Sequence, residues 1–307
     1  MFNDSGRSQI FTPPRRRAGS GSAASAAHIS RLRRYVPDPA LRRGGAVCEG
    51  AIKLLIVFLF VVAGYCGDAS ASEPVKATAA ISVGKDRDAV VAELFTSQSC
   101  SSCPAAQAFL GDLARRTDVI ALELHVDYWD QYKTLFAGSW KDPFSSPTWT
   151  QRQADYNRLI MGNDNVYTPQ MIIDGQLQDT GSRRGSINSM IEQAKNLRPG
   201  HYSVTPKISP KGDAAVTVDG PGLSKPVRVI LALLQKDAQT DVTAGENKGN
   251  KQVSHNVVRE MLVIGTWDGG KQAYKVSVPP LKDDESCAVI LQDPETMHIL
   301  SGGVCGL

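Results

Sequence analysis

Beyond its first 71 residues the sequence has no surplus of positive charge. From Ser72 to the end there are 24 Lys and Arg against 27 Asp and Glu. No basic surface is therefore left to attract a nucleic-acid backbone, and a nucleic-acid partner is disfavoured. No internal repeat is visible either. With 42% hydrophobic and 21% charged residues, the chain is neither disordered nor collagen-like, and its 307 residues suffice for two modest domains.

The sequence also has no methionine between Met1 and Met161. Residues 1–50 carry nine Arg among many Ala, Gly, Ser and Pro, a composition that predicts an extension unable to fold, or a true start nearer Val47. The apolar run 52–63 and the small residues 69–71 predict a signal peptide over 51–71, followed by a linker over 72–87. We therefore expect a periplasmic or secreted protein, which touches the membrane only through that segment if it stays uncleaved.

Cysteine is scarce, and four of the six cysteines lie beyond the expected cleavage point. An even number in an exported chain favours disulfide or redox chemistry over metal binding. Cys100 and Cys103 form a Cys-Ser-Ser-Cys motif. Cys287 and Cys305 are the two that remain, so we expect them to form a structural disulfide.

The hydrophobic pattern changes near Pro199-Gly200. Before it, runs of strand length alternate with stretches of helical period, which predicts a βαβ unit with the Cys-Ser-Ser-Cys motif between the first strand and its helix. After it, apolar residues recur at every second position. We expect an α/β domain over residues 88–199, with an aromatic-rich insertion, and a small antiparallel all-β sandwich or barrel over 200–307.

The dithiol would lie where a helix begins. There, unpaired N–H groups and the positive end of the helix dipole favour an anion. Cys100 at the N-cap would therefore be an exposed nucleophile of lowered pKa, and Cys103 the buried thiol that resolves a mixed disulfide. The alternative is a structural Cys100–Cys103 disulfide that undergoes no turnover.

Four motifs resemble those of secreted bacterial thioredoxin-like proteins grouped as domain of unknown function 1223, within the thioredoxin superfamily. They are Glu93-Leu-Phe-Thr-Ser-Gln-Ser-Cys-Ser-Ser-Cys-Pro104, His125-Val-Asp-Tyr-Trp-Asp130, Val166-Tyr-Thr-Pro-Gln170 and His255-Asn-Val-Val-Arg259. The resemblance covers about residues 88–307. It implies a thioredoxin-like fold for the first domain, whereas the activity of the family is itself uncharacterised.

The superfamily resemblance also implies site residues. Thr168 and Pro169 would form a cis-proline loop that offers backbone groups to an extended substrate. Glu93 could take the proton of Cys103, although its spacing from the first cysteine is one residue longer than in thioredoxin. The alternative, which we favour, is a hydrogen-bonded structural Glu93. Together these features predict a thiol-disulfide oxidoreductase that needs no cofactor and acts on protein dithiols or disulfides, or on a redox partner protein.

A second class of function stays open. His125 could join Cys100 and Cys103 in a soft-metal site, as in a copper-binding protein or metallochaperone. The simpler interpretation of His125 is a hydrogen-bonded polar residue at a strand end. For His255, Asn256 and Arg259 the sequence suggests no chemistry, and a contact with the first domain is the modest interpretation.

Overall fold

The computed structural model describes residues 89–133, 138–198, 200–209 and 211–305, all within one compact unit. The expected extension and signal peptide lie outside the described residues. The elements are, in chain order, β1 (Val90–Thr96), α1 (Pro104–Ala114), β2 (Val119–His125), α2 (Pro147–Met161), β3 (Gln170–Ile173), β4 (Leu177–Thr180), α3 (Arg184–Leu197), β5 (Ser203–Ile208), β6 (Asp213–Asp219), β7 (Val227–Asp241), β8 (Lys251–Trp267), β9 (Gln272–Ser277), β10 (Glu285–Gln292) and β11 (Ile299–Val304).

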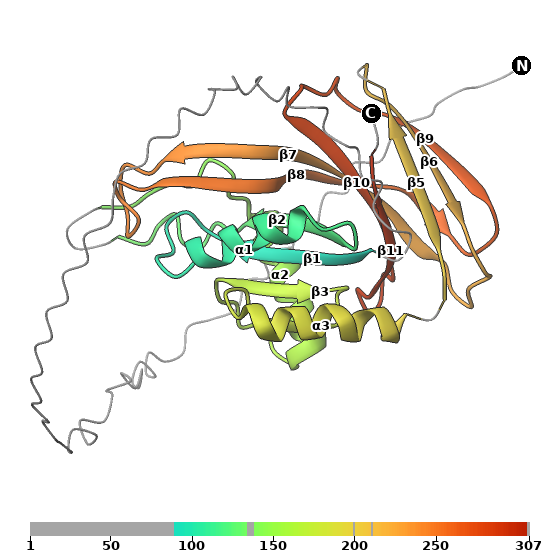
Figure 1. Cartoon of the computed structure of the whole chain (residues 1–307), viewed down its shortest axis with the longest axis horizontal. Helices are drawn as coiled ribbons and strands as arrows, with labels where there is room; N and C mark the ends of the chain where they lie inside the picture. The colour runs from blue at the N-terminus through green and yellow to red at the C-terminus, as the bar shows by residue number, and fades with distance from the viewer. Residues whose placement is uncertain (1–88, 134–137, 199, 210, 306–307) are drawn as a thin grey trace, which may run out of the picture. The chain divides into compact units, whose positions relative to one another are not determined.

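Most strands join one mixed sheet of eight, in the order β11-β10-β7-β8-β2-β1-β3-β4 (Figure 1). Strands β5, β6 and β9 form a second, three-stranded sheet. The expected fold class, a thioredoxin-like α/β domain followed by a separate all-β domain, is therefore wrong. The late strands β7, β8, β10 and β11 continue the sheet that β1 to β4 begin, through a parallel bridge between Glu123 of β2 and Val257 of β8.

Strands β7 and β8 form a long antiparallel hairpin of 15 and 17 residues. Its register shifts between Val229 and Ile230 and again between Leu233 and Leu234. Such bulges bend a strand and increase its twist. One half of the hairpin can therefore pair with β10, while the other half extends beside β2 and α1 (Figure 1).

The helices begin where local sequence signals place them. Pro104 and Pro147 open α1 and α2, since proline loses no helical hydrogen bond in the first turn. Ser146 caps α2 by accepting the Thr148 N–H at 3.2 Å, and Gly162 ends it in the left-handed conformation at φ 68°. No helix within the described residues combines the length and apolarity needed to cross a membrane.

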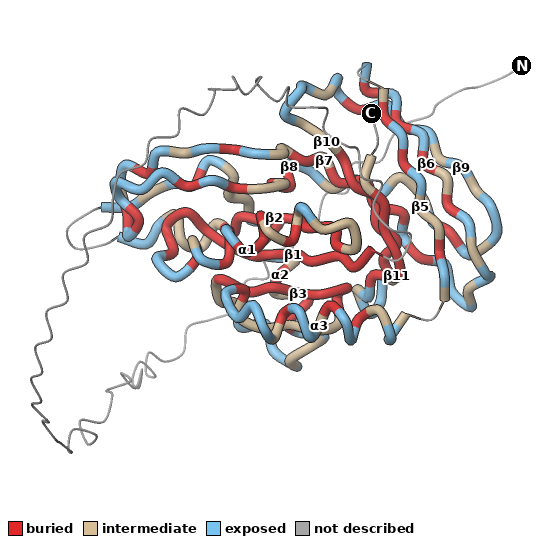
Figure 2. Tube along the Cα trace, viewed as in Figure 1, coloured by how far each residue is buried: buried red, intermediate tan, exposed pale blue. Residues whose placement is uncertain are grey.

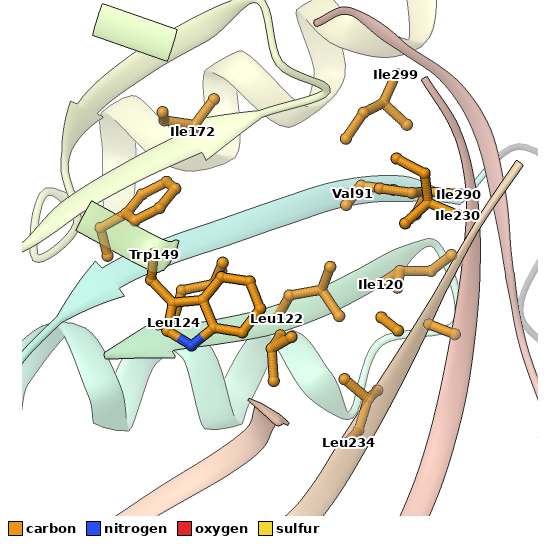
Figure 3. Packing of buried hydrophobic residues seen from close by; sticks show 14 of the residues in the cluster. Val91, Ile120, Leu122, Leu124, Trp149, Ile172, Ile230, Leu234, Ile290 and Ile299 are labelled. Atoms are coloured by element: carbon orange, nitrogen blue, oxygen red, sulfur yellow. The ribbon is translucent and has the colours of Figure 1, made fainter. Parts of the chain in front are cut away.

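Strand β1 is buried on both faces, which appears as a red band through the centre of Figure 2. Val90, Ala92 and Leu94 pack with α1 and α3. Val91 and Phe95 face the other way, into a cluster that includes Ile120, Leu122, Leu124, Trp149, Ile172, Ile230, Leu234, Ile290 and Ile299 (Figure 3). This cluster draws on both halves of the chain, so the two halves share part of their core.

Candidate redox site

Cys100 and Cys103 form a disulfide in the turn that precedes α1, with their Cα atoms 5.4 Å apart. The Cys103 N–H donates to the Cys100 carbonyl at 3.1 Å. The helix begins at Pro104, and Cys103 is its N-cap residue. The expectation that Cys100 caps the helix was wrong, because the turn uses all four residues of the motif before the helix starts.

Both sulfur-bearing residues are buried, and only the two serines between them are exposed. Cys100 is 1% exposed and Cys103 0%. The expectation of an exposed Cys100 therefore fails for the disulfide form of the protein. The cover comes from a segment far along the chain.

That cover is the β7–β8 loop, defined here as residues 242–250. Asn247 donates from its side-chain amide to the carbonyl oxygens of Gln98 and Cys100, both at 2.9 Å. Glu246 accepts the Ser101 N–H at 3.0 Å through its carboxylate. The loop is thus hydrogen-bonded to the backbone of Gln98, Cys100 and Ser101.

At Gly245 the β7–β8 loop passes close to Trp140. Gly245 has φ +76°, and a Cβ atom there would lie 3.1 Å from the Trp140 Cβ. Trp140 in turn accepts the Ser99 hydroxyl at its carbonyl, at 3.0 Å, and donates its indole N–H to the Gln98 side chain at 3.1 Å. A side chain at position 245 would strain the backbone and crowd this packing.

Behind the dithiol lies a buried ionic cluster centred on His125. One ring nitrogen is 2.6 Å from Asp142 and the other 3.0 Å from Glu123. Burial by itself lowers the pKa of His125, but the two carboxylates outweigh it and raise that pKa to about 10. Burial acts to raise the pKa of Asp142, yet the His125 charge and hydrogen bonds hold it below its usual range. His125 and Asp142 are therefore both charged near neutral pH.

Hydrogen bonds connect this cluster to the dithiol from two sides. Asp142 accepts the Gln98 N–H at 2.8 Å, two residues before Cys100. Glu123 accepts the Gln107 side-chain amide at 2.9 Å. Gln107 lies one helical turn after Cys103, and its N–H donates to the Cys103 carbonyl at 3.1 Å.

Glu93, expected to take the proton of Cys103, points to the opposite face of the sheet. Its carboxylate pairs with Arg152 at 2.7 Å and accepts the Tyr156 hydroxyl. Side chains of a strand alternate between the two faces of a sheet. Glu93 lies on the same face as Val91 and Phe95, whereas Leu94 lies on the face that packs against α1. Its role in proton transfer to the dithiol is therefore not supported by this placement.

The carboxylate on the α1 face is Glu123, which sequence reasoning missed. The alternation of side chains along β2 could have indicated it. Glu123 lies on the same face of the strand as Val119 and Ala121, which pack against α1. Asp142 was missed as well. It comes from the aromatic-rich insertion, and no periodic pattern in that part of the sequence predicts where the insertion packs.

The Thr168–Pro169 peptide bond is cis. Pro169 immediately precedes β3, whose Gln170 pairs with Phe95 of β1. Thr168 accepts the Trp129 indole N–H on its hydroxyl at 2.8 Å. These contacts place the two residues beside the strand that leads to the dithiol, while substrate binding by them remains a prediction.

The His255-Asn-Val-Val-Arg259 motif joins β8 to β2 and α1, which confirms the modest interpretation of a contact. The His255 N–H donates to Glu123 at 2.6 Å, and its ring lies against Gly111, where a Cβ atom would come within 2.6 Å. Asn256, at φ 52°, donates to the Ala121 carbonyl at 3.1 Å. Arg259 stacks over the Phe144 ring.

Cys287 and Cys305 form a second disulfide, with Cα atoms 5.1 Å apart. It links β10 to the end of β11, and the Cys305 N–H donates to the Cys287 carbonyl at 2.8 Å. The pair lies in a different core cluster from the residues that surround Cys100.

The described residues contain no group of three or more His, Cys, Asp or Glu side chains arranged to hold a metal ion. The copper alternative would need a ring nitrogen of His125 beside Cys100 and Cys103. Both nitrogens face carboxylates instead.

The fold and the site define a class: a mixed α/β protein with a buried disulfide turn at the start of a helix, covered by a hairpin loop. The chain belongs to the family described as Protein of unknown function (DUF1223), whose model matches residues 91–292. No curated protein matches the chain significantly.

Among solved structures, the chain is similar to a protein from Agrobacterium tumefaciens, with 28% identity and a TM-score of 0.59. The match covers 70% of this chain and 92% of that one. A domain of the outer membrane lipoprotein Omp28 from Porphyromonas gingivalis matches at 15% identity over 36% of this chain and 88% of that one. Its TM-score is only 0.22.

Proposed function

We propose that this protein exchanges disulfides with the dithiols or disulfides of other proteins through Cys100 and Cys103. The observation that carries the proposal is the disulfide turn that ends where α1 begins. Cys103 is the N-cap residue of α1, and Cys100 is bonded to it through the disulfide. Both sulfur atoms therefore lie near the N-terminus of the helix. A thiolate there is favoured by the positive end of the helix dipole.

The exchange balances without any further reagent. A partner thiolate attacks Cys100 Sγ, forming a mixed disulfide and breaking the Cys100–Cys103 bond, and Cys103 leaves as a thiolate that takes up a proton. A second partner thiolate then attacks the partner sulfur and releases Cys100, which is protonated in turn. The partner loses two electrons and two protons, and the protein gains them. In the reverse direction the same steps reduce a partner disulfide.

Two residues near Cys100, Ser102 and Cys103, are suited to this chemistry. The Ser102 hydroxyl lies 3.3 Å from Cys100 Sγ and can donate to a thiolate formed there. Cys103, at the helix N-cap and completely buried, is suited to the resolving role. The β7–β8 loop must move aside before a protein partner can reach Cys100.

Export to the periplasm or beyond the cell, and a relation to the thioredoxin superfamily, are parts of the same proposal. The signal-like sequence over 51–71 supports the first. The order strand, Cys-Ser-Ser-Cys, helix supports the second within β1 to β3 only, because the complete sheet has a different construction.

The test is a trapping experiment with two matched variants. Cys103→Ser keeps the attacking sulfur and removes the one that releases it, so its Cys100 thiolate should attack the disulfides of substrate proteins, release one substrate thiolate and accumulate as mixed disulfides. Cys100→Ser, the control, should trap none. Redox titration of the wild-type pair should show a two-electron couple. If Cys103→Ser traps no more than Cys100→Ser, the disulfide is structural.

A further inference from the structure

A groove of about 370 Å³ opens between the first two turns of α1 and the start of β8. The helix contributes Pro104, Gln107 and Ala108, and the strand side contributes residues 250–253 and 255. The groove therefore begins one residue beyond Cys103. No role has been assigned to it so far.

The strand side of this groove has an outer edge that no strand covers along residues 251–255. Strand β7 pairs with one edge of β8 there, from Asp241↔Lys251 to Asp237↔His255, and the bridge between β8 and β2 lies further on, at Val257. Sheet edges of this kind expose backbone donors and acceptors to which another strand can bind.

The directions of the backbone groups follow from the register. Asn250 accepts a hydrogen bond from Val242, so its carbonyl points toward β7. The His255 N–H instead points away from β7 and donates to the Glu123 side chain. Because these directions alternate along a strand, the N–H and C=O groups of Lys251 and Val253 point away from β7, and both residues line the groove.

We propose that an extended segment of the polypeptide partner binds in this groove as an added strand on the outer edge of β8, starting beside Pro104, the residue that follows Cys103. The inference rests on the proposed function and names the form in which its substrate is bound. The outward backbone groups of Lys251 and Val253 lie roughly 7 Å apart, enough to pair with about three residues of an added strand. Backbone pairing of this kind tolerates many sequences, as a protein that exchanges disulfides with unrelated partners requires.

The groove offers little side-chain recognition apart from an apolar contact. Val253 is 45% exposed, unusual for a valine in a strand, and Ala108 is exposed on the opposite wall. An apolar side chain of the bound segment can pack between these two residues. The nearby side chains of Lys251 and His255 are in contact with Asp241 and Asp237 on β7.

The test compares two oxidants of the reduced protein. One is a synthetic Val- and Thr-rich peptide carrying a cysteine as a mixed disulfide with glutathione, and the other is oxidised glutathione alone. Val253→Pro removes only the N–H that points away from β7, so the pairing with β7 stays intact. Its matched control, Val253→Thr, keeps that N–H.

We expect Val253→Pro to slow oxidation by the peptide about tenfold, the effect of one lost backbone hydrogen bond and its apolar contact, with oxidation by glutathione unchanged. Ala108→Trp, which fills the groove from an exposed helix position, should have the same selective effect, whether or not Val253→Pro folds. Equal slowing with both oxidants, or no slowing in Ala108→Trp, overturns the inference.

Two further outcomes separate this inference from the proposed function. If the wild-type protein reacts with glutathione but shows no preference for the peptide, the exchange stands and the groove has no role. If the wild-type protein elutes as a dimer and Ala108→Trp as a monomer, the groove binds a second copy and the inference is also overturned. Failure with both oxidants removes the proposed function itself.

Discussion

Asn247 of the β7–β8 loop donates two hydrogen bonds, at 2.9 Å each, across the segment that carries Cys100, one to the Cys100 carbonyl and one to that of Gln98. The two residues are 147 positions apart in the sequence. Asn247 is itself 4% exposed, so the contact is fully covered. The backbone around the disulfide is therefore covered by a loop of the hairpin, and we expect this loop to limit access to the two cysteines.

Asn247→Ala should make the Cys100–Cys103 disulfide react faster with a small thiol. The two lost hydrogen bonds together weaken the closed loop by about 2 kcal/mol, which predicts roughly a thirtyfold faster reduction by dithiothreitol. Lys248→Ala, at an exposed position of the same loop, is the control and should react like the wild type. Equal rates for all three proteins would mean that the loop does not limit access.

The His125 cluster predicts a specific loss of stability in alkaline solution. Since the pKa of His125 is raised to about 10, the folded protein keeps a proton that the unfolded chain loses near pH 6.5. The contribution is complete below about pH 6.5 and is lost as the pH rises toward 10. Between these values, the free energy of unfolding should fall by about 1.4 kcal/mol per pH unit.

Urea unfolding at several pH values measures this slope. His125→Gln, which cannot carry the proton, should be less stable at pH 7 and should lose that part of the slope between pH 7 and 9. A slope that is the same in both proteins would show that His125 is neutral in the folded state.

Glu93 and Glu123 provide a matched pair of buried carboxylates on opposite faces of the sheet. Glu93→Gln breaks the pair with Arg152 and should lower the free energy of unfolding by roughly 3 kcal/mol, while the reduction potential of Cys100–Cys103 stays unchanged. Glu123→Gln alters the hydrogen bond to Gln107 on α1 and should shift that potential. Redox titration of both variants checks this difference, and a shift caused by Glu93→Gln would contradict it.

The Cys287–Cys305 disulfide should be purely structural. Closing a loop with a sequence separation of 18 predicts about 3 kcal/mol of stability. The double variant Cys287→Ala with Cys305→Ala should unfold at lower urea concentration and keep the redox titration of Cys100–Cys103. Peptide mass spectrometry of the unreduced wild type should show the crosslink, and free thiols at both positions would refute it.

Much of the local structure could be predicted from the sequence. The three helices and the strands around the Cys-Ser-Ser-Cys motif have the expected order, because hydrophobic period, proline and glycine act over a few neighbouring residues. The alternating pattern after residue 200 also predicted strands correctly. It could not predict their partners, since alternation shows that one face is buried and not which strand lies alongside.

The sequence by itself determined the dithiol, its position before a helix, and the strand and helix periods. Only the tertiary structure decided that the late strands extend the first sheet, that Glu93 faces Arg152 while Glu123 and His125 lie behind the dithiol, and that Asn247 covers Cys100. The physical reason is the range of the interactions. Helix starts and turns depend on adjacent residues, whereas the bridge between Glu123 and Val257 and the contact between Asn247 and Cys100 join residues more than a hundred positions apart and follow from how the whole chain buries its apolar surface.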